Sequence, residues 1–222
     1  MQTNIGREIT DLKNDLIEMG AFVENCVKDS FVALRDNDKS LLDSIISRDT
    51  KTDAMEKEIE SRCLRLLVTL SPRARDFRFI AAVLKIITDL ERIGDQTQNI
   101  SEIQKFINDR FNAQVDLPVL SDMYKTVQEM LRLSMDAFVA EEPTLAYGID
   151  EMDNKVDKGF LQVRENIINK IREGVEDPGV ALDLLQIAKY VERIGDHAEN
   201  ISEWVIYAHT GNHPSLNNQL EK

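Results

Sequence analysis

The sequence is poor in the residues that interrupt helices or cross-link small domains. Among its 222 residues there are only 5 prolines, 9 glycines and 2 cysteines. The cysteines, Cys26 and Cys63, are too few for a disulfide framework and too far apart for a CxxC motif, which excludes a cysteine-based zinc or redox site. We expect both thiols to be buried as small hydrophobic groups in a reducing cytosol.

Basic residues and long apolar runs are also scarce. Lys and Arg number 27 against 40 Asp and Glu, a formal net charge of −13. This balance argues against nucleic acid as a partner, because phosphate neutralisation requires clustered Lys and Arg. The N-terminus has no apolar signal-peptide core. No run approaches the roughly 18 apolar residues that span a bilayer. We therefore expect a cytoplasmic protein with no membrane insertion.

The motifs of several enzyme classes are missing as well. The sequence contains no GxxxxGK[ST] phosphate loop and no GxGxxG motif. It has no ExxH pair of the kind used by di-iron carboxylate bundles. It also lacks the HExxH and GxSxG motifs of zinc proteases and α/β-hydrolases. These absences favour a protein that is not an enzyme.

What the sequence does contain is helical periodicity. Apolar residues recur at intervals of three and four, as on one face of an amphipathic helix, and no alternating strand pattern competes with them. Ser71 and Asp177 immediately precede prolines and are suitable N-caps. The pattern predicts an all-α fold of two tandem, antiparallel three-helix bundles, with domains at 1–112 and 113–222. The expected helices lie at about 9–32, 39–70, 72–108, 119–140, 143–173 and 178–209.

The strongest signal is an internal repeat. Residues 88–102, TDLERIGDQTQNISE, and 189–203, KYVERIGDHAENISE, are identical at nine of 15 positions. One helix upstream, Asp49 and Asp53 correspond to Asp153 and Asp157, and the segment Phe-Val-Ala near residue 31 echoes the same three residues from 138. The two halves therefore read as a duplicated three-helix unit.

The repeat places acidic pairs four residues apart at matching positions. Residues with this spacing project from one face of a helix, here to one side of the apolar stripe. Like charges so placed repel, and pairs brought together by adjacent helices require a cation. Oxygen ligands suit Mg²⁺, Ca²⁺ or Mn²⁺, and carboxylate clusters also hold Fe or Zn²⁺. The alternative is a solvated acidic face without metal, since a duplication copies structural residues as faithfully as functional ones.

Two glycines and a histidine stand out beside these pairs. Gly94 and Gly195 occupy helix interiors, where glycine costs about 1 kcal/mol relative to alanine. We expect close approach of another helix or of a bound ion at these positions. His197 has Gln96 at the matching place, so it is a candidate additional ligand in one half only, with a surface or outer-sphere role as the alternative. We expect Arg92 to point away from the acids beside it.

At the residues ERIGDQTQNISE and ERIGDHAENISE, each preceded one helix earlier by an aspartate pair, the chain resembles the PhoU family. The resemblance covers almost the whole sequence in motif, length and duplication. It implies tandem three-helix bundles, often dimeric, with multinuclear metal clusters on the surface. It also implies a regulator of phosphate uptake acting with the ATPase subunit of the phosphate ABC transporter and with the phosphate-sensing histidine kinase. These partners would bring it to the inner face of the membrane.

The resemblance also assigns metal ligands by position. Glu56, which follows Asp53, has Phe160 at its counterpart, so the two clusters are expected to differ in nuclearity or occupancy. The implied ligands are Asp49, Asp53, Glu91 and Asp95 in the first half and Asp153, Asp157, Glu192 and Asp196 in the second. Possible additional or outer ligands are Glu56, Asn99, Glu102, His197, Asn200 and Glu203.

Three functions remain open on the sequence. The first is a non-enzymatic, metal-binding regulator that restrains phosphate uptake and phosphate-starvation signalling when phosphate is plentiful. The second is a metal-dependent phosphohydrolase that uses the carboxylate clusters, since clustered divalent ions activate water. The third is a metal-free helical interaction module. Metal content and phosphatase activity of the purified protein separate the three.

Overall fold

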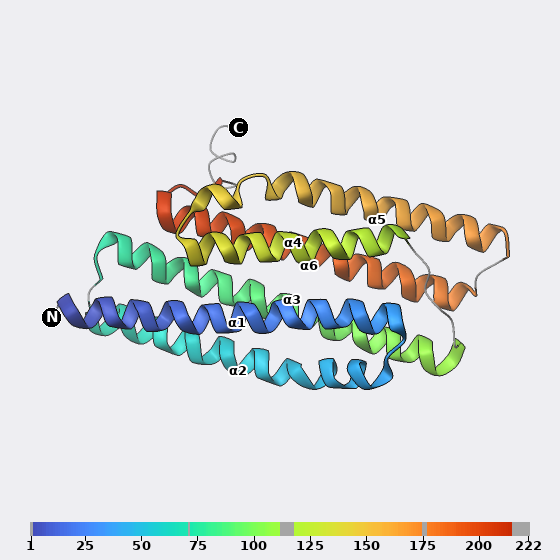
Figure 1. The fold of residues 1–222 in the computed structure, drawn as a ribbon, viewed down its shortest axis with the longest axis horizontal. Helices are drawn as coiled ribbons and strands as arrows, with labels where there is room; N and C mark the ends of the chain where they lie inside the picture. The colour runs from blue at the N-terminus through green and yellow to red at the C-terminus, as the bar shows by residue number, and fades with distance from the viewer. Residues whose placement is uncertain (1, 71, 112–117, 175–176, 215–222) are drawn as a thin grey trace.

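The computed structural model describes residues 2–70, 72–111, 118–174 and 177–214, and no β-strand occurs among them. Figure 1 shows α1 to α3 side by side in one half of the molecule and α4 to α6 in the other. The expectation of six helices in two three-helix units is confirmed, whereas the proposed boundary at 112/113 lies outside the described residues. The elements are α1 (Gln2–Asp36), α2 (Lys39–Leu70), α3 (Ala74–Phe111), α4 (Pro118–Ala140), the 3₁₀ turn η1 (Pro143–Ala146), α5 (Ile149–Arg172) and α6 (Pro178–Thr210).

One helix begins later than the periodicity predicts. The helix expected at 143–173 is preceded by the separate turn η1 and starts at Ile149. Gly148, which adopts a left-handed conformation with φ of 88°, separates the two elements. By contrast α6 begins as expected, because the Asp177 side chain accepts hydrogen bonds from the backbone N–H groups of Gly179 and Val180. Ser71, the other expected cap, lies outside the described residues.

The ends of α1 and α4 show how the two halves correspond. Asn37 and Glu141 both have positive φ, 57° and 55°. The next residue in each half returns a hydrogen bond five residues back, from Asp38 N to Ala33 O and from Glu142 N to Ala137 O, both at 3.1 Å. These are matching helix C-terminal motifs at a separation of 104 residues, the same as that between the aspartate pairs. The Phe-Val-Ala echo, at a separation of 107, is therefore not a structural correspondence and was a wrong alignment.

The halves pack together through α1 against α4 and through α3 against α6. A related pair of contacts marks the α1–α4 crossing. Phe31 stacks on Tyr124 with ring centroids 5.0 Å apart, and at the matching place Gly20 faces Met135, whose side chain leaves no room for a Cβ. Pairs related in this way indicate an approximate two-fold relation between the halves.

A large hydrophobic core runs through both halves, and a small separate cluster of Ala33, Leu42 and Ile45 lies in the first half. One continuous cluster contains fully buried residues from all six helices, among them Leu16, Ile59, Ile93, Val127, Val163 and Ile194. Cys63 belongs to it, and Cys26 is also buried, so both cysteines are free and buried as expected. No helix in the described ranges combines the length and apolar character needed to cross a lipid bilayer.

Candidate metal centres

The first acidic cluster lies where α2 meets α3. Asp49 and Asp53 occupy successive turns of α2, and Asp95 projects from α3. Each offers a carboxylate oxygen, and the three oxygens lie within 4.8 Å of one another. All three side chains are half-buried. Three anionic groups at this spacing form a site able to coordinate a multivalent cation.

The second cluster lies at the equivalent place between α5 and α6. Asp153, Asp157 and Asp196 again bring three carboxylate oxygens within 4.8 Å of one another. Asp153 is half-buried and the other two are exposed. The structure thus assembles six of the eight residues expected as ligands into two groups of three, at corresponding positions of the repeat.

Each cluster contains a buried carboxylate oxygen that lacks a hydrogen-bond partner within the described part of the chain. These atoms are Oδ1 of Asp49 and Oδ1 of Asp153. A buried carboxylate oxygen without a hydrogen-bond donor lowers the stability of the folded state, because its lost hydration is not replaced. A coordinated cation supplies the missing interaction. The arrangement therefore fits a metal ion at either site.

One half-buried aspartate in each cluster, Asp49 in the first and Asp153 in the second, has a raised pKa. Burial, and after it the negative charge of Asp95, raises the pKa of Asp49. In the second cluster burial, then the charges of Glu199 and Asp196, raise the pKa of Asp153 to about 7. Burial and the neighbouring negative charges both disfavour the anionic form of these two carboxyls.

The two glutamates of the repeated motif lie outside these groups of three. Glu91 lies beside Arg92, whose Nε is 3.4 Å from its carboxylate. Arg92 also reaches Asp95, with Nη1 at 3.2 Å from Oδ2, so the expectation that it points away from these acids was wrong. Burial and the charge of Asp95 raise the pKa of Glu91 to about 6. Glu192 is more than nine-tenths buried and accepts a hydrogen bond from Lys189.

The possible additional ligands have diverse surroundings. Glu56 Oε1 lies 3.4 Å from the Thr88 hydroxyl, and Glu102 accepts a hydrogen bond from Gln98. Asn99 donates to the backbone carbonyl of Asp95 at 2.8 Å. In the matching half, Phe160 replaces Glu56 and lies under Lys189, whose Nζ is 5.4 Å from the ring centroid. Glu56 and Thr88 in the first half thus correspond to Phe160 and Lys189 in the second. The first half has a carboxylate at this place, and the second has an aromatic ring and a cation.

His197 and Asn200 face the other half of the molecule. His197 Nδ1 lies 2.9 Å from Oδ1 of Asp89 on α3, and Asn200 Nδ2 lies 3.4 Å from the same oxygen. Both residues thus contribute to the contact between α3 and α6. Glu203 lies near His213, with 3.9 Å between Oε2 and Nδ1.

One acidic residue of the second site was not found from the sequence. Glu199 is half-buried and, after burial itself, is the largest contributor to the raised pKa of Asp153. It follows Asp196 by three residues, which places it on the same side of α6. Its counterpart in the first repeat is Gln98, so comparing the two repeats does not reveal it. The three-residue spacing from Asp196 was the one sequence signal that could have placed Glu199 beside the cluster.

The glycines of the repeated motif provide space for these groups. A Cβ on Gly195 would lie 3.1 Å from Asp153 Oδ1, whereas a Cβ on Gly94 would lie 3.0 Å from the methyl carbon of Thr52. Close approach of the neighbouring helix explains both positions. In the second half the atom that approaches is the unpaired carboxylate oxygen itself.

We expect Gly195→Ala to weaken metal binding at the second cluster by about tenfold without removing a ligand. The methyl group would displace the Asp153 carboxylate, while the higher helix propensity of alanine would offset part of the strain. Metal titration by calorimetry measures the effect. Gly94→Ala is the matched control, since it meets a methyl group and should spare binding; equal losses in both variants would contradict this account.

Asp153→Asn should stabilise the metal-free protein at pH 8. The pKa of Asp153 is about 7 in the folded state, against about 3.9 in unfolded chains. Between these values the folded state retains a proton that the unfolded state has lost, so the free energy of unfolding falls as the pH rises from 4 to 7. Asparagine stays neutral and avoids this loss.

Allowing for partial solvent exposure, we expect a gain of roughly 1 kcal/mol at pH 8, or about 2–4 °C in Tm, and almost none at pH 4. Thermal unfolding of the chelator-treated protein at both pH values gives the measurement. A variant that is equally destabilised at both pH values would show that the carboxyl group is required for packing.

Known proteins share the two-repeat organisation of this chain. The sequence matches the family described as PhoU domain over residues 16–104 and 120–205, one match in each half. It is 32% identical over 205 residues to the phosphate-specific transport system accessory protein PhoU homolog 1 of Thermotoga maritima, covering 92% of this chain and 88% of the relative. It is also 32% identical over 211 residues to the PhoU homolog of Clostridium acetobutylicum, covering 95% and 96%.

Solved structures agree in fold. The crystal structure of PhoU from Pseudomonas aeruginosa superposes with a TM-score of 0.86 at 29% identity, covering 93% of this chain and 99% of the other. The phosphate transport system regulatory protein PhoU from Streptococcus pneumoniae also gives 0.86, at 26% identity, covering 94% and 98%. The likeness therefore extends over both three-helix units.

Proposed function

The chain belongs to the PhoU family, and from this premise we propose that it is a non-enzymatic, metal-binding regulator of phosphate uptake. It restrains the high-affinity phosphate transporter and phosphate-starvation signalling when phosphate is plentiful. The names of its relatives, accessory and regulatory proteins of phosphate transport, support the regulatory part. The observation that carries the metal part is the pair of matching aspartate clusters, each with a buried oxygen that has no hydrogen-bond partner in the described part of the chain.

In this proposal the aspartates of each cluster hold the metal. Asp49, Asp53 and Asp95 bind in the first half, and Asp153, Asp157 and Asp196 bind in the second. Glu91 and Glu192 adjoin them and complete larger, multinuclear sites once Arg92 and Lys189 move aside. A bound iron, zinc, magnesium or manganese ion supplies the positive charge that offsets the repulsion among these carboxylates.

We further propose that the protein acts on the cytoplasmic side of the membrane through protein partners. The partners are the ATPase subunit of the phosphate transporter and the phosphate-sensing histidine kinase, and the protein itself works as a homodimer. A net charge of −13 suits docking on basic partner surfaces. An accessory protein of this kind transmits its state by contact and requires no catalytic step.

The metal part is tested with Asp95→Ala combined with Asp196→Ala. One residue is removed from each cluster, so the metal retained after purification without chelators should fall several-fold, while helicity by circular dichroism stays nearly unchanged. Asp122→Ala with Asp136→Ala, exposed aspartates on α4, is the control. Metal content equal to that of wild type would remove Asp95 and Asp196 from the ligand set. Phosphate release from phosphoesters that disappears in the cluster variant would favour an enzyme instead.

The regulatory part is tested in cells. Deletion of the gene should switch on a phosphate-starvation reporter in phosphate-rich medium, and the wild-type gene should switch it off again. The cluster variant should restore repression poorly, whereas the control variant should restore it fully. A reporter that stays off in the deletion strain would count against this function.

A further inference from the structure

A long acidic groove runs beside α6 and adjoins the second aspartate cluster, next to which Glu199 lies. It consists of two hollows of about 680 and 600 Å³ that share Asn200 and Glu203. The first hollow lies between η1, the start of α5 and α6. The second lies between α2, α3 and α6, so the groove crosses from one half of the molecule to the other.

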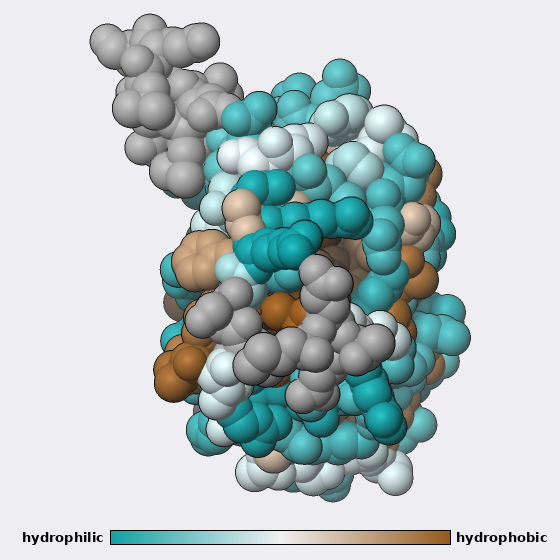
Figure 2. All heavy atoms as spheres, turned by 90° about the vertical axis from the view of Figure 1, so that its left-hand side faces the viewer, coloured by the Kyte–Doolittle hydropathy of each residue, from teal (hydrophilic) through white to brown (hydrophobic). Residues whose placement is uncertain are grey.

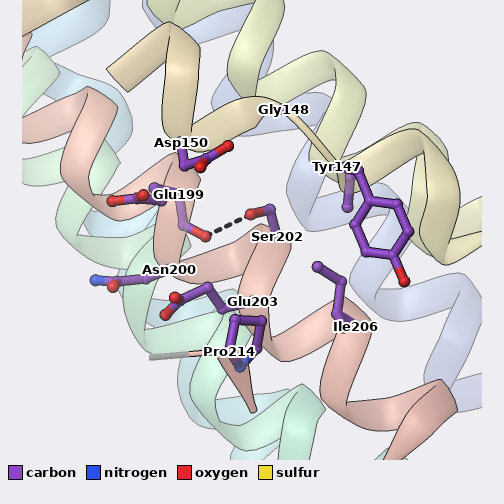
Figure 3. A pocket seen from close by; sticks show the side chains of 10 residues that line it. Tyr147, Gly148, Asp150, Glu199, Asn200, Ser202, Glu203, Ile206 and Pro214 are labelled. Carbon is purple, nitrogen blue, oxygen red and sulfur yellow. Dashed lines mark hydrogen bonds between the residues drawn. The ribbon is translucent and has the colours of Figure 1, made fainter. Parts of the chain in front are cut away.

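Carboxylates line both parts of the groove. Asp150, Glu199 and Glu203 line the first hollow, and Figure 3 shows their side chains gathered on one side of it, across from the ring of Tyr147. Glu60 and Asp89 add two more in the second hollow. Among the described lining residues Lys85 is the one Lys or Arg, and its Nζ lies 5.9 Å from the ring centroid of Trp204. Asp89 already pairs with His197. The main attraction for a cation therefore comes from the acids at the two ends of the groove, Glu60 and Asp150.

Apolar side chains accompany these acids. Tyr147 is 61% exposed and Leu64 is 50% exposed, one in each hollow. Trp204 lines the second hollow and packs edge-on against Tyr207 and His213, with ring centroids 5.5 and 4.3 Å away. Exposed aromatic and aliphatic groups bordered by charges of one sign are characteristic of a surface that binds a partner with the opposite charge.

The distribution of charge over the chain favours the same kind of partner. Residues 1–112 contain 17 basic and 20 acidic residues, a net charge of −3, whereas residues 113–222 contain 10 and 20, a net charge of −10. The half that supplies η1, α5 and α6 therefore exerts most of the long-range attraction on a cation.

A smaller alternative is a recess of about 220 Å³ between the halves, lined by residues of α1, α3, α4 and α6. Figure 2 looks onto the end of the molecule where α1 begins and shows mostly hydrophilic side chains there, with a few apolar ones among them. The cations of the recess are matched by the acidic residues Glu141 and Asp76, which also line it. Lys13 pairs with Glu141 at 2.9 Å, and Arg75 lies 3.7 Å from the same carboxylate. This recess is an internal contact between the halves and has no excess charge of either sign to select a ligand.

We propose that the groove along α6 binds a basic, amphipathic segment of a partner protein. Its Lys and Arg side chains pair with the carboxylates at the two ends, and its apolar side chains lie on Tyr147, Trp204 and Leu64. The inference rests on the proposed function, since a regulator without catalytic machinery acts through a partner. Because the groove spans both halves, an occupant contacts both.

Trp204 provides a direct probe, because it is the one tryptophan in the chain and lies in the groove. The ligand is a tryptophan-free, 16-residue peptide of Lys, Leu and Ala, with Leu at the i, i+3, i+4 and i+7 positions of a helix. We expect saturable binding that changes Trp204 emission and weakens as salt is raised. The same peptide with Glu in place of Lys should not bind. Binding with unchanged emission would place the peptide elsewhere and overturn the proposal.

Charge reversal at the two ends tests the groove itself. Glu60→Lys with Asp150→Lys should raise the peptide Kd at least tenfold. Glu58→Lys with Glu165→Lys makes the same charge change at exposed positions of the same two helices outside the groove, and should raise it less than threefold. Equal effects in both pairs would mean attraction to net charge alone and would overturn the proposal. If the reversal impairs folding, Glu60→Gln with Asp150→Asn is compared with Glu58→Gln and Glu165→Gln, which remove the same charge outside the groove.

Two further experiments distinguish a partner peptide from the chain's own C-terminus as the occupant of the groove, and failure of the groove proposal from failure of the proposed function. A chain ending at Pro214 should bind the peptide with unchanged affinity; binding that appears only in this shortened chain would assign the groove to residues 215–222 and overturn the proposal. Groove variants that retain metal but lose both peptide binding and reporter control support a groove that serves the regulatory partner, whereas variants that lose peptide binding and keep full reporter control would overturn that role. Wild-type protein that represses the reporter but leaves the peptide unbound would refute the groove and leave the proposed function standing.

Discussion

Metal ions should raise the Tm of the metal-free protein by about 8–16 °C for each cluster that is filled. An ion present at a thousand times its Kd, and bound only by the folded state, stabilises that state by about 4 kcal/mol. For a chain of this length each kcal/mol corresponds to roughly 2–4 °C. Thermal unfolding in the presence of chelator, then with Mn²⁺, Zn²⁺ or Fe²⁺ added, measures the shift and identifies the preferred ion.

The large shift depends on the aspartates and not on the general acidity of the surface. Asp49→Asn with Asp153→Asn removes the two carboxylates whose buried oxygens have no hydrogen-bond partner among the described residues, and it preserves the side-chain shape. The metal-induced rise should shrink to less than about 3 °C in this variant, a remainder that weak surface binding accounts for. A full rise in the double variant, or no rise in wild type with any of the three ions, would contradict the assignment.

Tyr124→Ala should lower the free energy of unfolding by about 3–5 kcal/mol, the range for removing a buried aromatic side chain. Tyr124 is fully buried between the halves and stacks on Phe31 of α1. The resulting cavity lies where α1 crosses α4 and is bordered by both helical units. Denaturant unfolding followed by circular dichroism measures the loss, which corresponds to a Tm shift of roughly 6–20 °C.

The same variant shows whether the two repeats unfold as one unit. Because the hydrophobic cluster is continuous across the halves, Trp204 fluorescence from the second half and the ellipticity of all six helices should report a single coincident transition. Tyr124→Phe is the control: it removes only the hydroxyl, 3.5 Å from Ser30 Oγ, and should cost about 1 kcal/mol or less. Two separated transitions would indicate repeats that fold independently.

Much of this architecture could be predicted from local sequence. Apolar spacing located the six helices, and four-residue spacing placed Asp49 with Asp53 and Asp153 with Asp157 on common faces. Both inferences work because helical periodicity depends on the backbone and is the same in any protein. The repeat then predicted that two such sites exist, since a duplicated unit carries its neighbours with it.

Other features of the site depended on contacts between distant segments. The sequence leaves His197 open as an additional ligand or as a surface or outer-sphere residue, and in the structure its ring lies beside Asp89 in the other half. Glu199 has no acidic counterpart in the first repeat, and only packing against α5 shows that it adjoins Asp153. The difference between Glu56 with Thr88 and Phe160 with Lys189 likewise becomes chemically meaningful only when α2 is placed beside α3 and α5 beside α6.

The sequence by itself determined the helical class, the duplication and the faces that carry the aspartates, because these follow from periodicities of three to four residues within single helices. The tertiary structure alone decided which oxygens meet within 4.8 Å, which of them are buried, and how the repeats share one core. Those properties depend on rotations and distances between helices. They are set by the packing of many side chains from both halves together, and no local pattern encodes them.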